Sequence, residues 1–131
     1  MCIRDSNVPD PDLGEGEEER IRSAIPPVHG FAAHNAPLGM TFVRGGRVPD
    51  DYRGAILVAL HGSWNRTTRD GYKVVSLHPR ADGGFDEREF VGGLEEDDDV
   101  IGRPVDVAEG PDGAFYVSDD YAGAVYRVSY R

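Results

Sequence analysis

The 131-residue sequence is poor in cysteine, methionine and phenylalanine, with one, two and five of each. The single cysteine, Cys2, excludes an internal disulfide framework and any metal site built from several cysteines. No apolar run approaches the roughly 20 residues that a membrane-spanning helix needs. A basic stretch followed by an apolar one, as in a secretory signal, is also missing from the N-terminus. We therefore expect no membrane insertion.

Positive charge is scarce as well. Fourteen Lys and Arg residues face 24 Asp and Glu residues, which gives a formal net charge of −10. Such a chain repels phosphate backbones and anionic lipid surfaces. The charge balance argues against nucleic-acid and membrane partners.

Glycine and proline are abundant, with 17 and nine residues, and this is typical of a chain of many short elements joined by turns. The segment Gly110-Pro111-Asp112-Gly113 has strong turn chemistry, because proline presets one turn position and glycine accepts positive φ. No helix of useful length is predicted. The pattern favours an all-β fold, with short β-favouring runs at 40–43, 55–60, 72–77, 105–108, 114–118 and 124–130.

These runs repeat. Gly54-Ala55 followed by 56–60 matches Gly113-Ala114 followed by 115–119, an offset of 59 residues. In each copy another strand begins at a later glycine. One more strand precedes the Gly-Ala pair in each copy. Three or four short strands repeated at this spacing are the signature of a radial β array. Two blades cannot close a propeller, so we expect more blades upstream, the end of the chain being compatible with a natural C-terminus.

The first copy carries an insert. Ten residues, His61 to Asp70, join its strands, against three, Asp120 to Ala122, in the second. Inserted loops on a regular scaffold are where binding groups collect. Trp64 could stack on a flat ring and Arg66 could form a forked pair with a carboxylate. The alternative is that Trp64 caps the hydrophobic core while Arg66 and Asp70 are solvated.

Other candidates are weaker alone. His34 lies just before the first strand, where a lone histidine is more often structural. Arg103 and Asp106 could form an ordinary surface ion pair. Asp119-Asp120 has no accompanying spaced set of oxygen ligands that would indicate Ca²⁺. The acidic run 95–99 is most simply a solvated loop.

Taken together, six segments resemble the C-terminal part of pyrroloquinoline-quinone (PQQ)-dependent sugar dehydrogenases, nearest the sorbosone and pyranose dehydrogenase type. The resemblance covers 29–131, lies in the combination and order of the motifs, and leaves the leader out. The segments are Ala36-Pro37-Leu38-Gly39-Met40, Tyr52-Arg53-Gly54, His61-Gly62-Ser63-Trp64-Asn65-Arg66, Gly71-Tyr72-Lys73-Val74-Val75, Gly102-Arg103-Pro104-Val105-Asp106-Val107 and Pro111-Asp112-Gly113.

The resemblance implies a fragment comprising the last two or so blades of a six-bladed β-propeller. It implies a parent enzyme in which PQQ, usually with Ca²⁺, oxidises an aldose or sugar aldehyde and passes electrons to an external acceptor. A periplasmic or secreted location is implied too. The family's catalytic histidine and Ca²⁺ ligands belong to earlier blades, so the chain alone is expected to be inactive.

Site residues follow from the same resemblance. Arg103 stands where related enzymes place the first of two cofactor-binding arginines, whereas the second would fall at Val105. His61 falls near a cofactor lysine and His34 near a cofactor-proximal threonine. The predicted PQQ-binding set is His34, His61, Trp64, Asn65, Arg66 and Arg103, with no catalytic residue and no metal ligand.

Two other interpretations stay open. One is a non-catalytic propeller used as a binding scaffold, since one architecture hosts many functions. The other is a free-standing small β protein that dimerises through its open edges. In every case residues 1–28 are predicted to be a disordered or extended leader, the first six being a non-native junction, and 29–131 the partial propeller.

Overall fold

The computed structural model describes residues 11–12, 14–45, 47–97 and 99–130, so the predicted junction of the first six residues lies outside the described part. The chain divides into two compact units, 1–30 and 31–131. The described part of the first unit contains a short helix, α1 (Glu18–Ser23), within the segment predicted to be extended. Opposite charges at its N-terminal end pair, with Arg20 Nη1 3.0 Å from Glu17 Oε2. The domain boundaries themselves stay a prediction.

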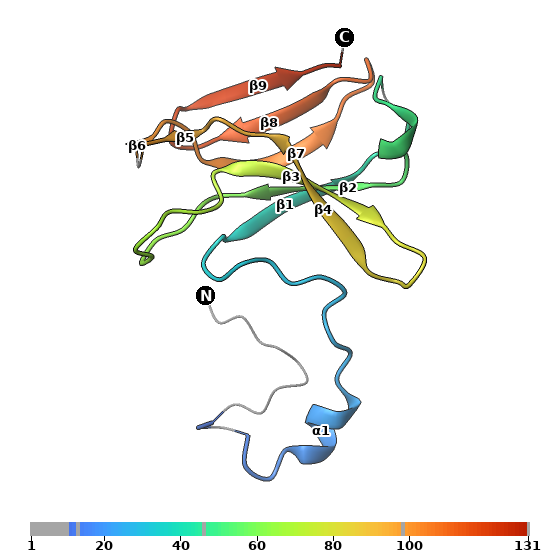
Figure 1. The fold of residues 1–131 in the computed structure, drawn as a ribbon, viewed down its shortest axis with the longest axis vertical. Coiled ribbons are helices and arrows are strands. Elements are labelled where there is room, and N and C mark those ends of the chain that lie inside the picture. The colour runs from blue at the N-terminus through green and yellow to red at the C-terminus, as the bar shows by residue number, and fades with distance from the viewer. Residues whose placement is uncertain (1–10, 13, 46, 98, 131) are drawn as a thin grey trace. The chain divides into compact units, whose positions relative to one another are not determined.

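The second unit begins with a four-stranded antiparallel sheet, here called the first blade. Its order β1-β2-β3-β4 follows the chain, so each strand pairs with the next (Figure 1). Strand β2 is aliphatic throughout and the interior of β3 is buried, which suits a sheet covered on both faces. A 3₁₀ turn at Asp50–Tyr52 connects the first two strands. The strands are β1 (Pro37–Phe42), β2 (Ile56–Leu60), β3 (Lys73–Pro79) and β4 (Phe85–Val91).

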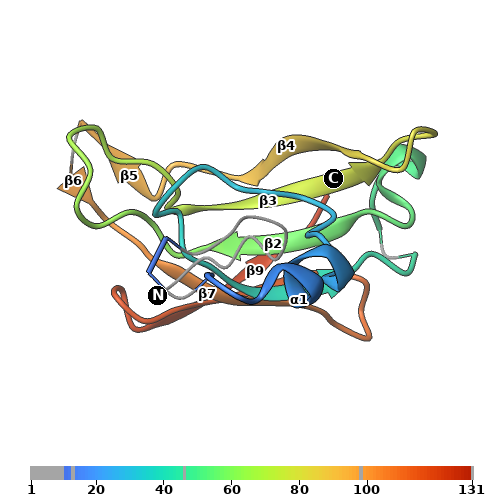
Figure 2. The same ribbon diagram turned by 90° about the horizontal axis from the view of Figure 1, so that it is seen from below.

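A three-stranded antiparallel sheet, the second blade, completes the unit. It comprises β7 (Pro104–Glu109), β8 (Phe115–Asp119) and β9 (Ala124–Val128), again in chain order. A small hairpin, β5 (Glu95–Glu96) and β6 (Asp99–Val100), lies between the two blades in the sequence. Figure 1 shows the second blade above the first, and Figure 2, seen from below, shows β4, β3 and β2 of the first blade side by side. In both views the loop after β2, the β5–β6 hairpin and the β8–β9 turn lie at the same end.

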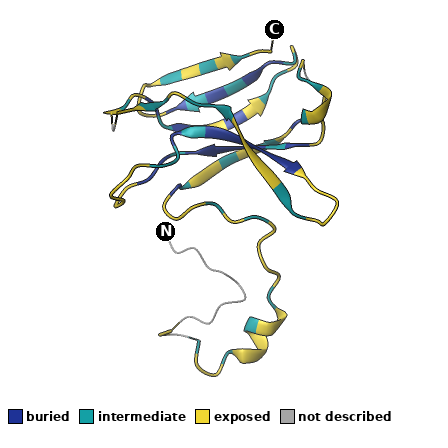
Figure 3. Ribbon diagram, viewed as in Figure 1, coloured by how far each residue is buried: buried dark blue, intermediate teal, exposed yellow. Residues whose placement is uncertain are grey.

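The main core lies between the blades, as the dark strands of Figure 3 indicate. Leu57 and Val74 from the first blade pack with Val107, Phe115 and Val117 from the second. Side chains alternate between the two faces of a strand, so residues two apart share a face and can pack into the same core. Fully burying each such side chain contributes about 1.5–3 kcal/mol before conformational entropy is counted.

A second cluster covers the other face of the first blade. Val58, Leu60, Val75 and Leu77 are buried there. Met40 pairs with Val58 in register, so it points to this same face, yet it remains exposed. This blade therefore keeps an uncovered apolar side chain on its β1 strand.

The strand expectations are largely confirmed, and the misses have a physical reason. All six β-favouring runs overlap strands, and Gly110–Gly113 forms the expected turn, with Gly113 N donating to Gly110 O at 3.0 Å. Strand β4 was missed because its interior residues, 86–89, are all charged. The acidic run 95–99, expected to be a loop, contributes both strands of the β5–β6 hairpin. These strands form because they pair with neighbouring strands, whereas the propensity of their own residues does not favour them.

Candidate functional site

An open cavity of about 510 Å³ lies at the end where the loops of the two blades meet. Such a size lies within the range of small-molecule and cofactor sites. Both blades and the hairpin between them contribute. The loop after β2 provides Ser63, Trp64, Asn65, Arg66, Arg69 and Tyr72, and the later segments provide Asp99, Val100, Arg103 and Tyr121.

The insert loop, residues 61–70, is closed at its base by reciprocal hydrogen bonds. Ser63 N donates to Asp70 O at 2.8 Å, and Asp70 N donates to Ser63 Oγ at 3.0 Å. The Tyr72 hydroxyl donates to Ser63 O. Gly62 makes room for the Tyr72 ring, because a Cβ at Gly62 would lie 2.2 Å from the ring. The φ of Gly62 is +110°, a backbone conformation that also favours glycine. The loop is thus anchored and not free.

Asp70 is the charged anchor of this loop. Burial alone would raise the pKa of its carboxyl group, but the hydrogen bonds from Gly71 N and the Asn35 side chain, with the positive charges of Lys73 and Arg66, lower the pKa overall. Arg66 lies 3.5 Å from Asp70 Oδ2. Asp70 is therefore held ionised, and its negative charge holds the side chains of Arg66 and Lys73.

Arg66 also ties the loop to the segment before β1. Its Nη1 donates to Ala33 O at 3.0 Å. The side chain lines the cavity while its guanidinium already has two protein partners. Arg66 and Asp70 are therefore not simply solvated charges, which contradicts the alternative interpretation.

Trp64 at the tip of the loop is 68% exposed and lines the cavity. The alternative that it caps the core is therefore wrong. The edge of its ring faces His34, with 6.1 Å between ring centroids. Both His34 and Asn65 have positive φ, at 68° and 55°. Left-handed backbone at residues other than glycine is uncommon and clusters at functional sites.

Arg103, just before β7, differs from Arg66 in having an unused donor. Its Nε is buried and has no hydrogen-bond partner among the described residues. Such a group costs about 1–3 kcal/mol when nothing compensates it. Its expected partner Asp106 is exposed, and the Asp106 carboxylate instead accepts from Val107 N. Arg103 lines the cavity, so its side chain lies where an anion would bind.

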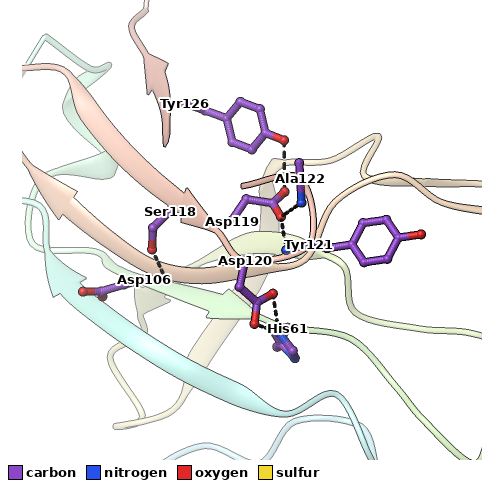
Figure 4. A network of polar contacts seen from close by, with 8 residues as sticks. All are labelled: His61, Asp106, Ser118, Asp119, Asp120, Tyr121, Ala122 and Tyr126. Carbon is purple, nitrogen blue, oxygen red and sulfur yellow. Dashed lines mark hydrogen bonds and ion pairs between the residues drawn. The ribbon is translucent and has the colours of Figure 1, made fainter. Parts of the chain in front are cut away.

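His61 joins the two blades beside the cavity. Its Nε2 lies 3.0 and 3.2 Å from the two carboxylate oxygens of Asp120 (Figure 4). A carboxylate only accepts hydrogen bonds, so Nε2 carries the hydrogen and Nδ1 points elsewhere. The pair connects the end of β2 to the β8–β9 turn.

The structure thus brings together four of the six predicted cofactor residues. Trp64, Asn65, Arg66 and Arg103 line the cavity, whereas His34 and His61 stand beside it without lining it. Their cofactor roles stay predictions. The predicted set lacks six lining residues, although Tyr121 lies in the turn that corresponds to the insert loop. Those missing are Ser63, Arg69, Tyr72, Asp99, Val100 and Tyr121. Within the described ranges, no three His, Cys, Asp or Glu residues gather as a metal site.

Comparison with known proteins decides the family. The sequence model of the TrAA12-like family matches residues 10–131. The chain belongs to the TrAA12-like family. A relative in Borreliella burgdorferi, described as an uncharacterized protein, is 38% identical over 110 residues. That alignment covers 82% of this chain but only 29% of the relative, so the chain spans less than a third of that protein's length.

Two solved structures are similar to this member of the family. The holo form of the pyranose dehydrogenase PQQ domain from Coprinopsis cinerea has a TM-score of 0.62 and 29% identity, covering 83% of this chain and 30% of that one. The iodide structure of the Trichoderma reesei carbohydrate-active enzyme of family AA12 has a TM-score of 0.63 at 22% identity, covering 84% and 29%. The predicted fold, an all-β part of a propeller, is confirmed. Across the described residues, no helix is long and apolar enough to cross a membrane.

Proposed function

We propose that this chain forms one wall of a PQQ pocket in a longer quinoprotein that oxidises an aldose or sugar aldehyde. The observation that carries the proposal is a cavity of cofactor size lined by three arginines, of which Arg103 has a buried Nε with no hydrogen-bond partner in the part of the chain that the structure describes. The similarity to the PQQ domain of a pyranose dehydrogenase supports the same assignment. The chain spans 30% of that domain's length, so the activity belongs to the longer protein.

The charges around the cavity fit a planar tricarboxylate. Three arginines, Arg66, Arg69 and Arg103, line it against one carboxylate, Asp99, in a chain whose net charge is −10. A charge-assisted hydrogen bond from a guanidinium to a carboxylate contributes about 1.5–3 kcal/mol. The positive charge is therefore concentrated where an anionic cofactor would bind.

Aromatic surface is present at the same place. Trp64 and Tyr121 come from different blades, line the cavity and are largely exposed. Exposed rings of this kind provide flat contact area for a fused-ring ligand at low entropic cost. The anchors of the insert loop, Ser63 and Asp70, fix the base from which Trp64 projects, which reduces the ordering cost on binding.

PQQ, when bound, supplies the hydride acceptor for sugar oxidation. In this proposal the Arg103 guanidinium would bind a cofactor carboxylate, Arg69 would add positive charge, and Trp64 would stack on the ring. His61 and Asp120 keep the two blades together beside the pocket. The base that takes the substrate proton and the ligands of Ca²⁺ are assigned to the preceding blades, and this chain alone is inactive.

The finer assignments belong to the same proposal. They are a sorbosone-like substrate, an external electron acceptor, no nucleic-acid partner, no insertion into a membrane and a periplasmic or secreted location. The residue pattern that resembles the sorbosone and pyranose dehydrogenase branch supports the substrate class.

The test uses the full-length protein loaded with PQQ and Ca²⁺. PQQ binding is followed by its absorbance, and aldose oxidation by the bleaching of an artificial acceptor dye. Arg103→Ala should weaken PQQ binding about tenfold or more, because it removes a charge-assisted hydrogen bond. Arg88→Ala is the matched control, since Arg88 is exposed on β4 and pairs with Asp51 at 3.1 Å.

Equal PQQ affinity in the Arg103 and Arg88 variants would remove Arg103 from the pocket. A full-length wild type that binds no PQQ would contradict the quinoprotein assignment and favour the non-catalytic scaffold instead.

A further inference from the structure

Asp119, at the end of β8, is a buried acid beside the cavity but not in its wall. It is 4% exposed. One oxygen, Oδ1, accepts hydrogen bonds from Tyr121 N at 2.9 Å and Ala122 N at 2.8 Å. The other, Oδ2, accepts from the Tyr126 hydroxyl at 3.0 Å (Figure 4). The carboxylate thus holds the β8–β9 turn from inside.

The same carboxylate also reaches the segment before β7. It accepts a hydrogen bond from the backbone N–H of Arg103. Gly102 allows this approach, because a Cβ at Gly102 would lie 2.4 Å from Asp119 Oδ2. The glycine before Arg103 therefore has a specific reason: any side chain there would displace the carboxylate.

The donors around Asp119 outweigh its burial. Burial alone would raise the pKa of Asp119, but hydrogen bonds from Ala122 N, Arg103 N, the Tyr126 hydroxyl and Tyr121 N lower it. The group is ionised at neutral pH, and its acceptor sites are filled by these donors.

Two of these donors belong to residues that line the cavity. Arg103 and Tyr121 come from separate segments, and their backbone N–H groups meet on this carboxylate. We propose that Asp119 is a positioning residue for the cofactor cavity, fixing the main chain of Arg103 and Tyr121 relative to each other so that the guanidinium and the phenol ring face the same ligand. The inference rests on the proposed function for the nature of that ligand.

Asp120, the next residue, has a different role, so the positioning role is specific to Asp119. Asp120 turns outward and pairs with His61 of the first blade, whereas Asp119 turns inward. Of the four described donors to Asp119, Ala122 and Tyr126 do not line the cavity, and Tyr126 alone donates from its side chain. Tyr126→Phe therefore removes a hydrogen bond from the same carboxylate while leaving both cavity segments held. It is the matched control.

The first measurement is PQQ affinity of the full-length protein. Asp119→Asn keeps the size of the side chain but removes its charge and replaces one acceptor oxygen with a donor, so the hydrogen bonds to the main chain are weakened. We expect its dissociation constant for PQQ to rise about tenfold. Tyr126→Phe should change it less than about twofold, because that hydroxyl only adds stability. Thermal unfolding of both variants separates affinity from stability.

The second measurement needs neither PQQ nor a variant. In full-length wild type with ¹⁵N-labelled arginine, tyrosine and alanine, the backbone amide signals of Arg103, Tyr121 and Ala122 are followed as the pH falls. The three signals should shift together, at a pH below the ordinary range of an aspartate. Because no substitution is involved, this readout survives if Asp119→Asn does not fold.

The outcomes are distinct. If the wild type binds no PQQ, the proposed function fails, while a common titration of the three amides still supports positioning by Asp119. Independent titration of Arg103 and Tyr121 would overturn the inference. So would equal losses of PQQ affinity in Asp119→Asn and Tyr126→Phe, because the carboxylate would then act through stability alone.

Discussion

The two blades solve the same local problem in different ways. Each must bring polar groups to the end of a strand beside the cavity. The first blade does so with a long insert loop whose own groups close it, Ser63 against Asp70 and Tyr72. The second has a short turn organised by one buried carboxylate, Asp119. A long loop distributes its support, whereas a short turn depends on a single residue.

The blades also differ in how they are covered. The first is buried on both faces of β2 and β3, and the second is buried mainly on the face toward the first. Val125 of β9 is 67% exposed on the outer face, where it pairs with Ser118. The shared core between the blades is therefore expected to carry more of the stability than either outer face.

Phe115→Ala tests this shared core and should have the largest effect. Phe115 is buried between the blades and its ring meets that of Phe90 edge-on, with centroids 5.4 Å apart. Its removal leaves a cavity and should lower the free energy of unfolding by about 3–5 kcal/mol in urea titrations. Val125→Ala, on the outer face, should cost less than about 0.5 kcal/mol. Equal costs would show that the blades do not share one core.

Gly62→Ala compares the insert loop with the short turn. An added Cβ would meet the Tyr72 ring, and φ is +110°, so overpacking should cost about 1–3 kcal/mol in unfolding free energy. The control is Gly123→Ala in the β8–β9 turn, where φ is +62° and nothing lies within 4 Å of an added Cβ. Only backbone strain of about 1–2 kcal/mol applies there. A control that costs more than Gly62→Ala would contradict the packing argument.

Acid should weaken both blades through their depressed carboxyl groups. The pKa values of Asp70 and Asp119 are lower in the folded chain than in the unfolded one, so their stabilisation is present above the unfolded pKa and is lost as pH falls through the folded pKa. Asp119→Asn and Asp70→Asn should each flatten the decline in melting temperature between neutral and acidic pH. Unchanged slopes in both variants would remove these groups from the acid response.

The His61–Asp120 pair should give the smallest effect. It bridges the blades, but Asp120 is exposed, and exposed pairs contribute about 0–1 kcal/mol. A double-mutant cycle with His61→Gln and Asp120→Asn, read by urea unfolding, should give a coupling energy in that range that shrinks with added salt. A larger, salt-independent coupling would contradict the view that this pair is a weak contact screened by solvent.

Much of the fold could be predicted because its signals are local. β-Branched and aromatic runs between glycines predicted six strands, and the repeat at 59 residues predicted two blades. Strand β4 could not be predicted, since its charged interior is tolerated only by pairing with β3. The hairpin β5–β6 was missed because its strands have two residues each, which is too short to show an alternating pattern in the sequence.

The candidate site divides in the same way. Trp64, Asn65 and Arg66 were found because the insert loop is visible when the two copies are aligned, and Arg103 was found by family resemblance. Tyr121 was missed because its three-residue turn carries no insert, although the alignment of the two copies matches that turn with the insert loop. His34 was assigned to the pocket by resemblance; its ring lies 6.1 Å from that of Trp64, and it does not line the cavity.

The sequence by itself determined the all-β class, the two blades, the excess of acid and the place of the insert loop, because composition, turn residues and repeats are properties of adjacent residues. Only the tertiary structure decided that Asp119 turns inward while Asp120 turns outward, and that Arg103 keeps a buried donor with no partner among the residues described. Those outcomes depend on strand register and on segments far apart in the chain meeting at one end of the stacked blades.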